Sequence, residues 1–200
     1  PMFDQFHDIG RDLFVAGLIT SHGGNMSVRL GDRILITRRG AMLGRLKTGD
    51  LIETGLERDD AMVTLASTEL VVHRAIYRNT SALAIVHTHP IHATALSLVE
   101  DALVPVDSEG SYLLHRVPVA VTARTVGSAE VAEVLPPLLR DHKIALLRGH
   151  GAFAVGELLE EAYMVSSTLE ASAQILSLVR AYGEDRVREY RSGADQYDRW

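Results

Sequence analysis

The chain has 200 residues, of which 46% are hydrophobic, and it contains no cysteine. This length and apolar fraction fit a single domain with a sizeable core, and the lack of thiols excludes a disulfide framework or a thiolate metal site. The formal net charge is −6 and the basic residues are dispersed along the chain, so we expect no nucleic-acid partner.

The first half of the chain alternates between helical and strand patterns. Apolar residues at helical spacing predict a helix within residues 3–18, and a hairpin is predicted over 25–38 around the turn "LGDR". A second helix is predicted to open at Thr68, with Ser67 or Thr68 as its N-cap. The run "LAIVHTH" then predicts a short buried strand, which Pro90 ends before a helix over "IHATALSLV".

The second half continues the alternation. It reads as a strand over "RVPVAV", a helix over "SAEVAEVLPPLLRDH" and two strands around the glycines of "KIALLRGHGAFAVG". We expect Pro136 and Pro137 to disturb the latter part of that helix. The clearest helical periodicity covers residues 158–182, and a partly ordered tail or short helix is expected from about 183. Interleaved strands and helices predict a single layered α/β domain over residues 1–200.

No segment has the pattern of a membrane or export signal. The stretch "PMFDQFHDIGRDLF" is amphipathic and acidic, unlike the basic start and apolar run of a signal peptide. No apolar run is long enough to span a bilayer. We therefore expect a cytoplasmic protein with no membrane partner.

Three of the nine histidines lie within six positions of the segment "AIVHTHPIHA". His87 and His89 are two residues apart at the end of a predicted strand, so their side chains point to the same side of the sheet. That arrangement suits two imidazole ligands on one metal ion. His150 is the best candidate for a third ligand, because its flanking glycines allow the backbone to approach a crowded site. Three protein ligands leave a coordination position open, which is typical of a catalytic site.

The next histidine, His92, falls on the predicted helix and is interpreted as a supporting or packing residue, not a ligand. His7, His115 and His142 are assigned to packing or to the surface.

Glu69 lies in the first turn of a predicted helix, where an acid commonly stabilises the helix dipole or caps it. The preceding Ser67 and Thr68 add hydroxyls to the unpaired backbone N–H groups of a helix N-terminus, a combination suited to phosphate. His73 lies one turn later on the same face, where it either supports the carboxylate or packs.

Two loops supply further candidates for binding an anion. Gly24 and Asn25 lie in the small-residue loop "SHGGNMSVR", and Arg39 and Gly40 follow a predicted strand in "TRRGAML". A guanidinium fork there can bind phosphate or carboxylate. For the neighbouring Arg38 we favour a solvated basic turn.

In order and spacing, "GGNMSVR", "ITRRG", "STELVVHRAIY", "VHTHPIHATAL" and "LLRGHGAFAVG" together resemble the class II aldolase/adducin family over roughly residues 5–180. The resemblance implies a three-layer sandwich with a central, mainly antiparallel sheet covered by helices. It also implies a homotetramer with active sites at subunit interfaces, and a reversible cleavage of a ketose 1-phosphate to dihydroxyacetone phosphate and a small aldehyde. L-fuculose 1-phosphate or a related deoxy sugar phosphate is the expected substrate, and the aldehyde is left open.

On this resemblance, the zinc ligands are His87, His89 and His150, and Glu69 is the catalytic acid/base, a residue that can also bind the metal when substrate is absent. Mn²⁺ or Co²⁺ are alternatives to Zn²⁺. The phosphate site comprises Gly24, Asn25, Arg39, Gly40, Ser67 and Thr68.

The sequence departs from the family pattern at two kinds of position. His22 and Arg39 stand where the related aldolases have threonine, which predicts a more cationic anion pocket or a different anion. The family also uses tyrosines from a neighbouring subunit, and none of Tyr112, Tyr182, Tyr190 and Tyr197 is assigned to that role.

Three alternatives remain open within the family. A pentulose-phosphate 4-epimerase carries aspartate at the position of Glu69 by the same resemblance, so glutamate favours the aldolase. A methylthioribulose-phosphate dehydratase is the second alternative. The third is a non-catalytic adducin-like interaction domain, which loss of the metal histidines would mark; all three are present.

Overall fold

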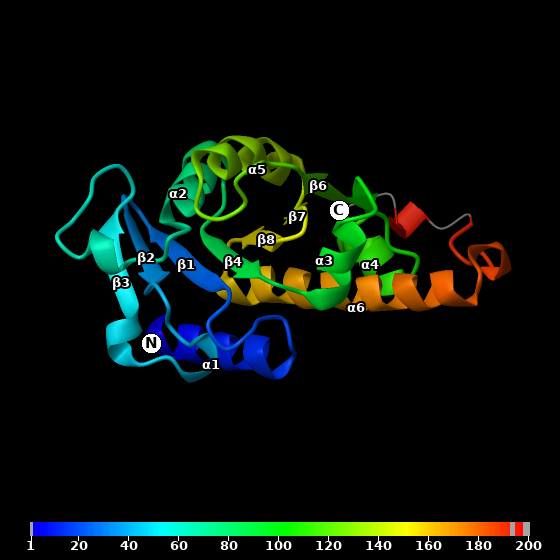
Figure 1. Cartoon of the computed structure of the whole chain (residues 1–200), viewed down its shortest axis with the longest axis horizontal. Coiled ribbons are helices and arrows are strands. Elements are labelled where there is room, and N and C mark those ends of the chain that lie inside the picture. The colour runs from blue at the N-terminus through cyan, green and yellow to red at the C-terminus, as the bar shows by residue number, and fades with distance from the viewer. Residues whose placement is uncertain (1, 193–194, 198–200) are drawn as a thin grey trace.

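The computed structural model describes residues 2–192 and 195–197, in which eight strands form one sheet in the order β3-β2-β1-β4-β8-β7-β6-β5 (Figure 1). All neighbouring strands are antiparallel except β6 and β7, which are parallel. The strands are β1 (Asn25–Leu30), β2 (Arg33–Thr37), β3 (Leu51–Gly55), β4 (Ala84–Thr88), β5 (Ala102–Leu103), β6 (Val117–Ala120), β7 (Ile144–Leu147) and β8 (Gly151–Gly156).

Helices cover both faces of this sheet, with α2 and α5 on one face and α1 and α6 on the other (Figure 1). The α-helices are α1 (Met2–Val15), α2 (Leu70–Asn79), α3 (Ile91–Ser97), α4 (Ser108–Leu113), α5 (Ala129–Asp141) and α6 (Leu159–Tyr182). Short 3₁₀ turns lie at Leu43–Arg45, Thr48–Asp50, Val63–Leu65, Glu184–Arg186 and Asp195–Tyr197. The predicted three-layer, mainly antiparallel architecture is confirmed. Among the described residues, no helix has both the length and the apolar character needed to cross a bilayer.

Two apolar cores lie on the two faces of the sheet, and the central strand β4 contributes to both. Ala84 and Val86 pack into the core beneath α1 and α6, whereas Ile85 packs into the core beneath α2 and α5. Because both faces are covered, the strand is a continuous apolar run without polar alternation. The same alternation places His87 on the face of Ile85, where it stacks on Phe153 of β8.

The prediction that Ser67 or Thr68 caps the second helix is wrong. The predicted N-caps Ser67 and Thr68 lie outside α2, which begins at Leu70 with Glu69 in the N-cap position. The Ser67 hydroxyl instead accepts a hydrogen bond from the Glu69 amide at 3.2 Å, so Ser67 forms a turn just before the helix.

The two adjacent prolines do not interrupt α5, which continues through Pro136 and Pro137 to Asp141. The apolar face of this helix, including Val131 and Leu135, is buried against the sheet. We attribute the continuity to this burial, which outweighs the hydrogen bonds that two prolines remove.

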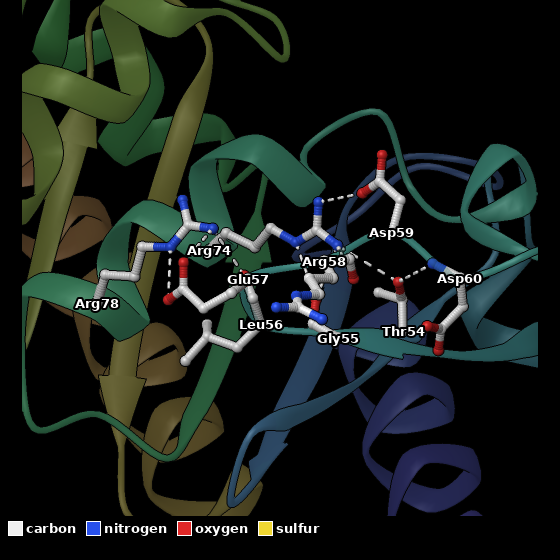
Figure 2. Close-up of polar contacts among 9 residues, drawn as sticks. All are labelled: Thr54, Gly55, Leu56, Glu57, Arg58, Asp59, Asp60, Arg74 and Arg78. Carbon is white, nitrogen blue, oxygen red and sulfur yellow. Dashed lines mark hydrogen bonds and ion pairs between the residues drawn. The ribbon is translucent and has the colours of Figure 1, made fainter.

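Arg74 fastens α2 to the loop that follows β3. Its guanidinium donates to the Gly55 carbonyl at 2.7 Å and to Asp59 Oδ1 at 2.7 Å, and only 14% of its side chain is exposed (Figure 2). Arg78, one turn later, donates to Glu57 Oε1 at 3.0 Å. These bonds hold α2, which begins directly after Glu69, against the loop that follows β3.

The contact between α1 and the turn at Leu43–Arg45 gives a stability test. Alanine usually stabilises a helix interior relative to glycine by about 0.5–1 kcal/mol, but a Cβ at Gly10 would overlap the backbone oxygen of Leu43. We expect Gly10→Ala to lower the free energy of unfolding by about 1–3 kcal/mol in urea titrations. Gly49→Ala, where an added Cβ meets no atom within 4 Å, is the matched control and should stay close to wild type.

Candidate active site

Three histidine rings meet at one end of the central strands. His87 and His89 come from the end of β4, and His150 comes from the turn between β7 and β8. Their ligand atoms lie within 4.8 Å of one another. The Nε2 atom of His87 is 3.0 Å from Nε2 of His89 and 3.3 Å from Nε2 of His150.

Antiparallel pairing of β4 with β8 brings these distant segments together. His87 lies opposite Phe153 in the register, and Thr88 lies opposite Ala152. At Gly151 a Cβ would overlap the Thr88 carbonyl oxygen and crowd the His89 ring, so only glycine permits this approach. The expectation that a flanking glycine serves a close approach is thereby confirmed for Gly151.

The hydrogen bonding of His87 fixes which nitrogen faces the other rings. Its Nδ1–H donates to the Ala152 carbonyl at 2.9 Å, so in the neutral ring the lone pair is on Nε2. Burial holds the pKa of His87 well below its usual value and lowers the pKa of His89 to about 4. Burial also lowers the pKa of His150, with the Thr125 backbone opposing the change. All three rings are therefore neutral near pH 7.

The arrangement fits a divalent metal ion. Tetrahedral Zn²⁺ binds imidazole nitrogens at about 2.0–2.1 Å, which places them about 3.3–3.4 Å apart, close to the observed separations of 3.0 and 3.3 Å. Neutral imidazoles suit Zn²⁺ and other first-row metals. His87, His89 and His150 can thus hold a metal through their Nε2 atoms.

Glu69 is a buried carboxyl in the same cavity. Its side chain is almost fully covered, Oε1 accepts a hydrogen bond from the Gly127 amide at 2.9 Å, and Oε2 has no partner among the described residues. Burial raises the pKa of Glu69 to about 6, although the Gly127 amide opposes the shift. A carboxyl of this kind can exchange a proton near neutral pH.

A cavity of about 230 Å³ joins the histidines, Glu69 and the predicted anion-binding residues. Its walls comprise His22, Gly23, Gly24, Asn25, Arg38, Arg39, Gly40, Ser67, Thr68, Glu69, His87, His89, Val126 and His150. Every residue predicted for the metal, the acid/base and the phosphate site therefore lies on one cavity.

Polar groups on the anion side of this cavity are available to a ligand. The buried Asn25 Oδ1 has no partner among the described residues. Arg38 pairs with Asp50 at 2.8 Å, so its solvated-turn interpretation is replaced by a partly exposed ion pair. The neighbouring Arg39 is exposed, and its guanidinium makes no hydrogen bond or ion pair in the described part of the chain.

A family model for the class II aldolase and adducin N-terminal domain matches residues 4–177. The chain belongs to the class II aldolase and adducin family. It is 32% identical over 175 residues to an L-fuculose phosphate aldolase of Methanocaldococcus jannaschii, covering 87% of this chain and 94% of that protein. It is also 32% identical over 187 residues to a 3-oxo-tetronate 4-phosphate decarboxylase of Pectobacterium atrosepticum, covering 90% and 84%.

Among solved structures, an L-fuculose-1-phosphate aldolase from Thermus thermophilus is 42% identical and has a TM-score of 0.87. The match covers 94% of this chain and 98% of that one. Together with the family match, these relatives identify a metal-dependent lyase of the class II aldolase type.

Two other histidines of the class II aldolase sequence do not enter the cavity. His73 is fully buried and hydrogen-bonds Ser27 at 2.6 Å, so it packs α2 on β1 and makes no bond to the Glu69 carboxylate. His92 is not part of the histidine cluster; its Nδ1 bonds Glu170 of α6 at 2.7 Å. It therefore ties α3 to α6 and does not line the cavity.

The structure adds Gly127 to the aldolase site, a residue that the sequence did not indicate. Gly127 supplies the amide that holds Glu69, and a Cβ there would overlap the backbone oxygen of Thr68. The available signal was a glycine directly before Ser128, the N-cap of α5. Nothing in that local pattern reveals contact with a residue 58 positions earlier.

The raised pKa of Glu69 predicts a pH-dependent stability in the metal-free protein. The folded-state pKa of about 6 exceeds the ordinary value of 4.5. The stability that the protonated Glu69 carboxyl contributes is therefore fully present below about pH 4.5 and is lost as pH rises through about 6. Glu69→Gln removes this loss. At about pH 8 the free energy of unfolding of Glu69→Gln, measured in urea, should exceed that of wild type by about 2 kcal/mol.

Near pH 4.5 the two proteins should converge. Glu133→Gln, which changes an exposed carboxyl, should match wild type at both pH values. If Glu69→Gln and wild type have the same free energy of unfolding at the higher pH, burial of the charged carboxylate carries no such penalty.

Proposed function

We propose that this chain is a cytoplasmic zinc-dependent aldolase that cleaves a ketose 1-phosphate to dihydroxyacetone phosphate and a small aldehyde. L-fuculose 1-phosphate or a related deoxy sugar phosphate is the proposed substrate, and Mn²⁺ or Co²⁺ can replace Zn²⁺. The observation that carries this proposal is the convergence of three neutral imidazoles with a buried, proton-exchanging carboxyl on one cavity.

In this proposal His87, His89 and His150 hold the metal. When bound, the metal supplies a Lewis acid that stabilises the negative charge developing on the substrate carbonyl oxygen. The neutral state of the rings supports this role, because near pH 7 no imidazole proton has to be displaced for binding.

Glu69 is proposed to move the proton. In the synthesis direction it takes the proton from the carbon next to the carbonyl, and in the cleavage direction it returns it. The Gly127 amide holds Oε1, which leaves the unpartnered Oε2 as the atom that exchanges the proton. Its raised pKa supports the role, because general acid–base catalysts work best near the operating pH.

Gly24, Asn25, Arg39, Gly40, Ser67 and Thr68 are proposed to bind the phosphate. Ser67 and Thr68 precede α2, whose dipole favours an anion at its N-terminal end. Arg39 adds a guanidinium without a competing partner in the described residues. Binding the phosphate away from the reacting carbon supplies energy for orienting the substrate.

We also propose a homotetramer with active sites at subunit interfaces. Val126 lines the cavity and is 63% exposed, and Ile91, two residues after His89, is 70% exposed. None of the tyrosines considered for catalysis lines the cavity of its own chain, within the residues that the structure describes. Light scattering at micromolar concentration should give a tetramer, and a monomer would contradict this assembly.

A decarboxylase acting on a 3-oxo acid phosphate is the second candidate. Two observations favour it: the relative of that activity at 32% identity, and the additional cation Arg39 at the anion pocket. Loss of carbon dioxide leaves the same kind of negative charge beside a carbonyl. Unlike cleavage of a ketose 1-phosphate, it does not require a base to remove the proton of the C4 hydroxyl group. Glutamate at position 69 favours the aldolase over the epimerase and dehydratase alternatives, and retention of all three histidines argues against a non-catalytic adducin-like role.

A substrate panel distinguishes these activities. Zinc-loaded protein is incubated with the 1-phosphates of fuculose, rhamnulose, ribulose and deoxy- or methylthioribulose, and with 3-oxo-tetronate 4-phosphate, while dihydroxyacetone phosphate and carbon dioxide are measured. We expect dihydroxyacetone phosphate from at least one ketose, and a kcat lowered about 10²–10⁴-fold by Glu69→Gln.

The exposed variant Glu133→Gln is the control and should retain wild-type kcat. Decarboxylation of 3-oxo-tetronate 4-phosphate also yields dihydroxyacetone phosphate, so the substrate that releases it decides. Carbon dioxide and dihydroxyacetone phosphate from 3-oxo-tetronate 4-phosphate, with no dihydroxyacetone phosphate from any ketose, would transfer the assignment to the decarboxylase. No product from any substrate, despite bound zinc, would contradict both activities.

A further inference from the structure

The short helix α3 connects the two loops that carry the clustered histidines. It begins at Ile91, just after His89, and ends at Ser97. At that end, the Ser97 hydroxyl accepts a hydrogen bond from the Gly149 amide at 3.0 Å, directly before His150. The helix that starts beside His89 therefore holds the turn that carries His150.

Arg148 strengthens this connection. Its Nε donates to the Ser97 carbonyl at 2.9 Å, and its Nη2 donates to the Glu100 carbonyl at 3.0 Å and to Asp101 Oδ1 at 2.5 Å. Carbonyls at the end of a helix lack partners within the helix, and a cation is favourable there. The guanidinium fork thus fastens the β7–β8 turn to the C-terminal end of α3.

Apart from packing against the rings of His87 and His89, the His150 ring has few other restraints. Its Nδ1 makes no hydrogen bond of ordinary geometry in the described residues, although the Thr125 backbone is close enough to influence its pKa. By contrast, Nδ1 of His87 donates to a backbone carbonyl. The position of the His150 ring therefore depends on the backbone of its turn.

That turn is held from several directions. The His150 amide donates to the Leu147 carbonyl at 3.0 Å, and the Arg148 amide donates to the Ala120 carbonyl at 2.9 Å. Gly149 adopts a φ of 70°, which favours glycine. Of the side chains, Arg148 and Ser97 connect the turn to the helix that follows His89.

We propose that Arg148 and Ser97 are positioning residues for the third imidazole. They act through the backbone of Gly149 and keep Nε2 of His150 within reach of Nε2 of His87. Neither residue lines the cavity, so neither touches substrate. The inference rests on the proposed metal site and adds the side chains that hold it in shape.

The test measures metal binding, not turnover. Zinc affinity is determined by competition with a chromogenic chelator for wild type, Arg148→Met and Ser97→Ala, and the visible absorption of the Co²⁺-loaded proteins reports the ligand geometry. We expect Arg148→Met to bind zinc about 10- to 100-fold more weakly, as is typical when partners that orient a ligand are removed. Ser97→Ala should weaken binding in the same direction and alter the Co²⁺ spectrum.

Arg78→Met is the matched control. Arg78 also donates to a carboxylate and to a backbone carbonyl, at 3.0 Å and 2.7 Å, but it fastens the loop after β3 at the other end of α2 (Figure 2). The variant should bind zinc within about twofold of wild type. Thermal unfolding of each metal-free variant separates a local effect from a general loss of stability. If Arg148 only stabilised the fold, its replacement would lower Tm and leave zinc affinity unchanged.

The outcomes separate this inference from the function on which it rests. Wild-type protein that binds no zinc, Mn²⁺ or Co²⁺ would overturn the proposed function. Wild-type protein that binds zinc, with Arg148→Met and Ser97→Ala within about twofold of it, would overturn the positioning role alone. If Arg148→Met does not fold, Ser97→Ala and Arg148→Lys carry the same test; Lys retains the charge but not the fork, so it should also weaken binding.

Discussion

The antiparallel pairing of β4 with β8 is the constraint on which the site depends. It aligns β4, which contains His87 and is followed by His89, with β8, which follows His150, across more than sixty positions of sequence. Gly151 permits the approach because any side chain there would overlap the Thr88 carbonyl oxygen. The burial of both strands between two helical layers then makes the register rigid, since a slip by one residue would reverse every inward-facing side chain.

Burial also sets the chemistry of the groups that this pairing collects. It keeps the imidazoles neutral and therefore ready to bind a metal, and it raises the pKa of Glu69 toward neutrality. The same low-polarity surroundings thus have opposite effects on bases and acids, because in each case the uncharged form is favoured. The proposed anion site combines the exposed Arg39, Gly40 and Thr68 with the buried Asn25 and Ser67.

Local patterns and short motifs in the sequence predicted the layers, most of the strands and the residues proposed for the metal, the acid/base and the phosphate, but not the short strand β5 or the cavity residue Val126. His87 and His89 share a side by strand alternation, and the glycines around His150 indicated a close approach. Features set by tertiary contact were not predictable: the Gly127 amide reaches Glu69 from a distant loop, and α5 continues through two prolines because its apolar face is buried. His73 lies one turn from Glu69, yet packing directs its ring to Ser27.

X-ray absorption spectroscopy of the zinc-loaded protein tests the proposed metal centre most directly, because it reports the number and type of ligands of the bound metal. We expect a four-coordinate ion with three imidazole nitrogens at about 2.0–2.1 Å and one oxygen ligand. Replacing His150 by alanine should remove one imidazole contribution and leave the other two. A wild-type protein that takes up no metal, or whose metal has fewer than three imidazole ligands, would contradict the assignment of this histidine cluster as the catalytic metal centre.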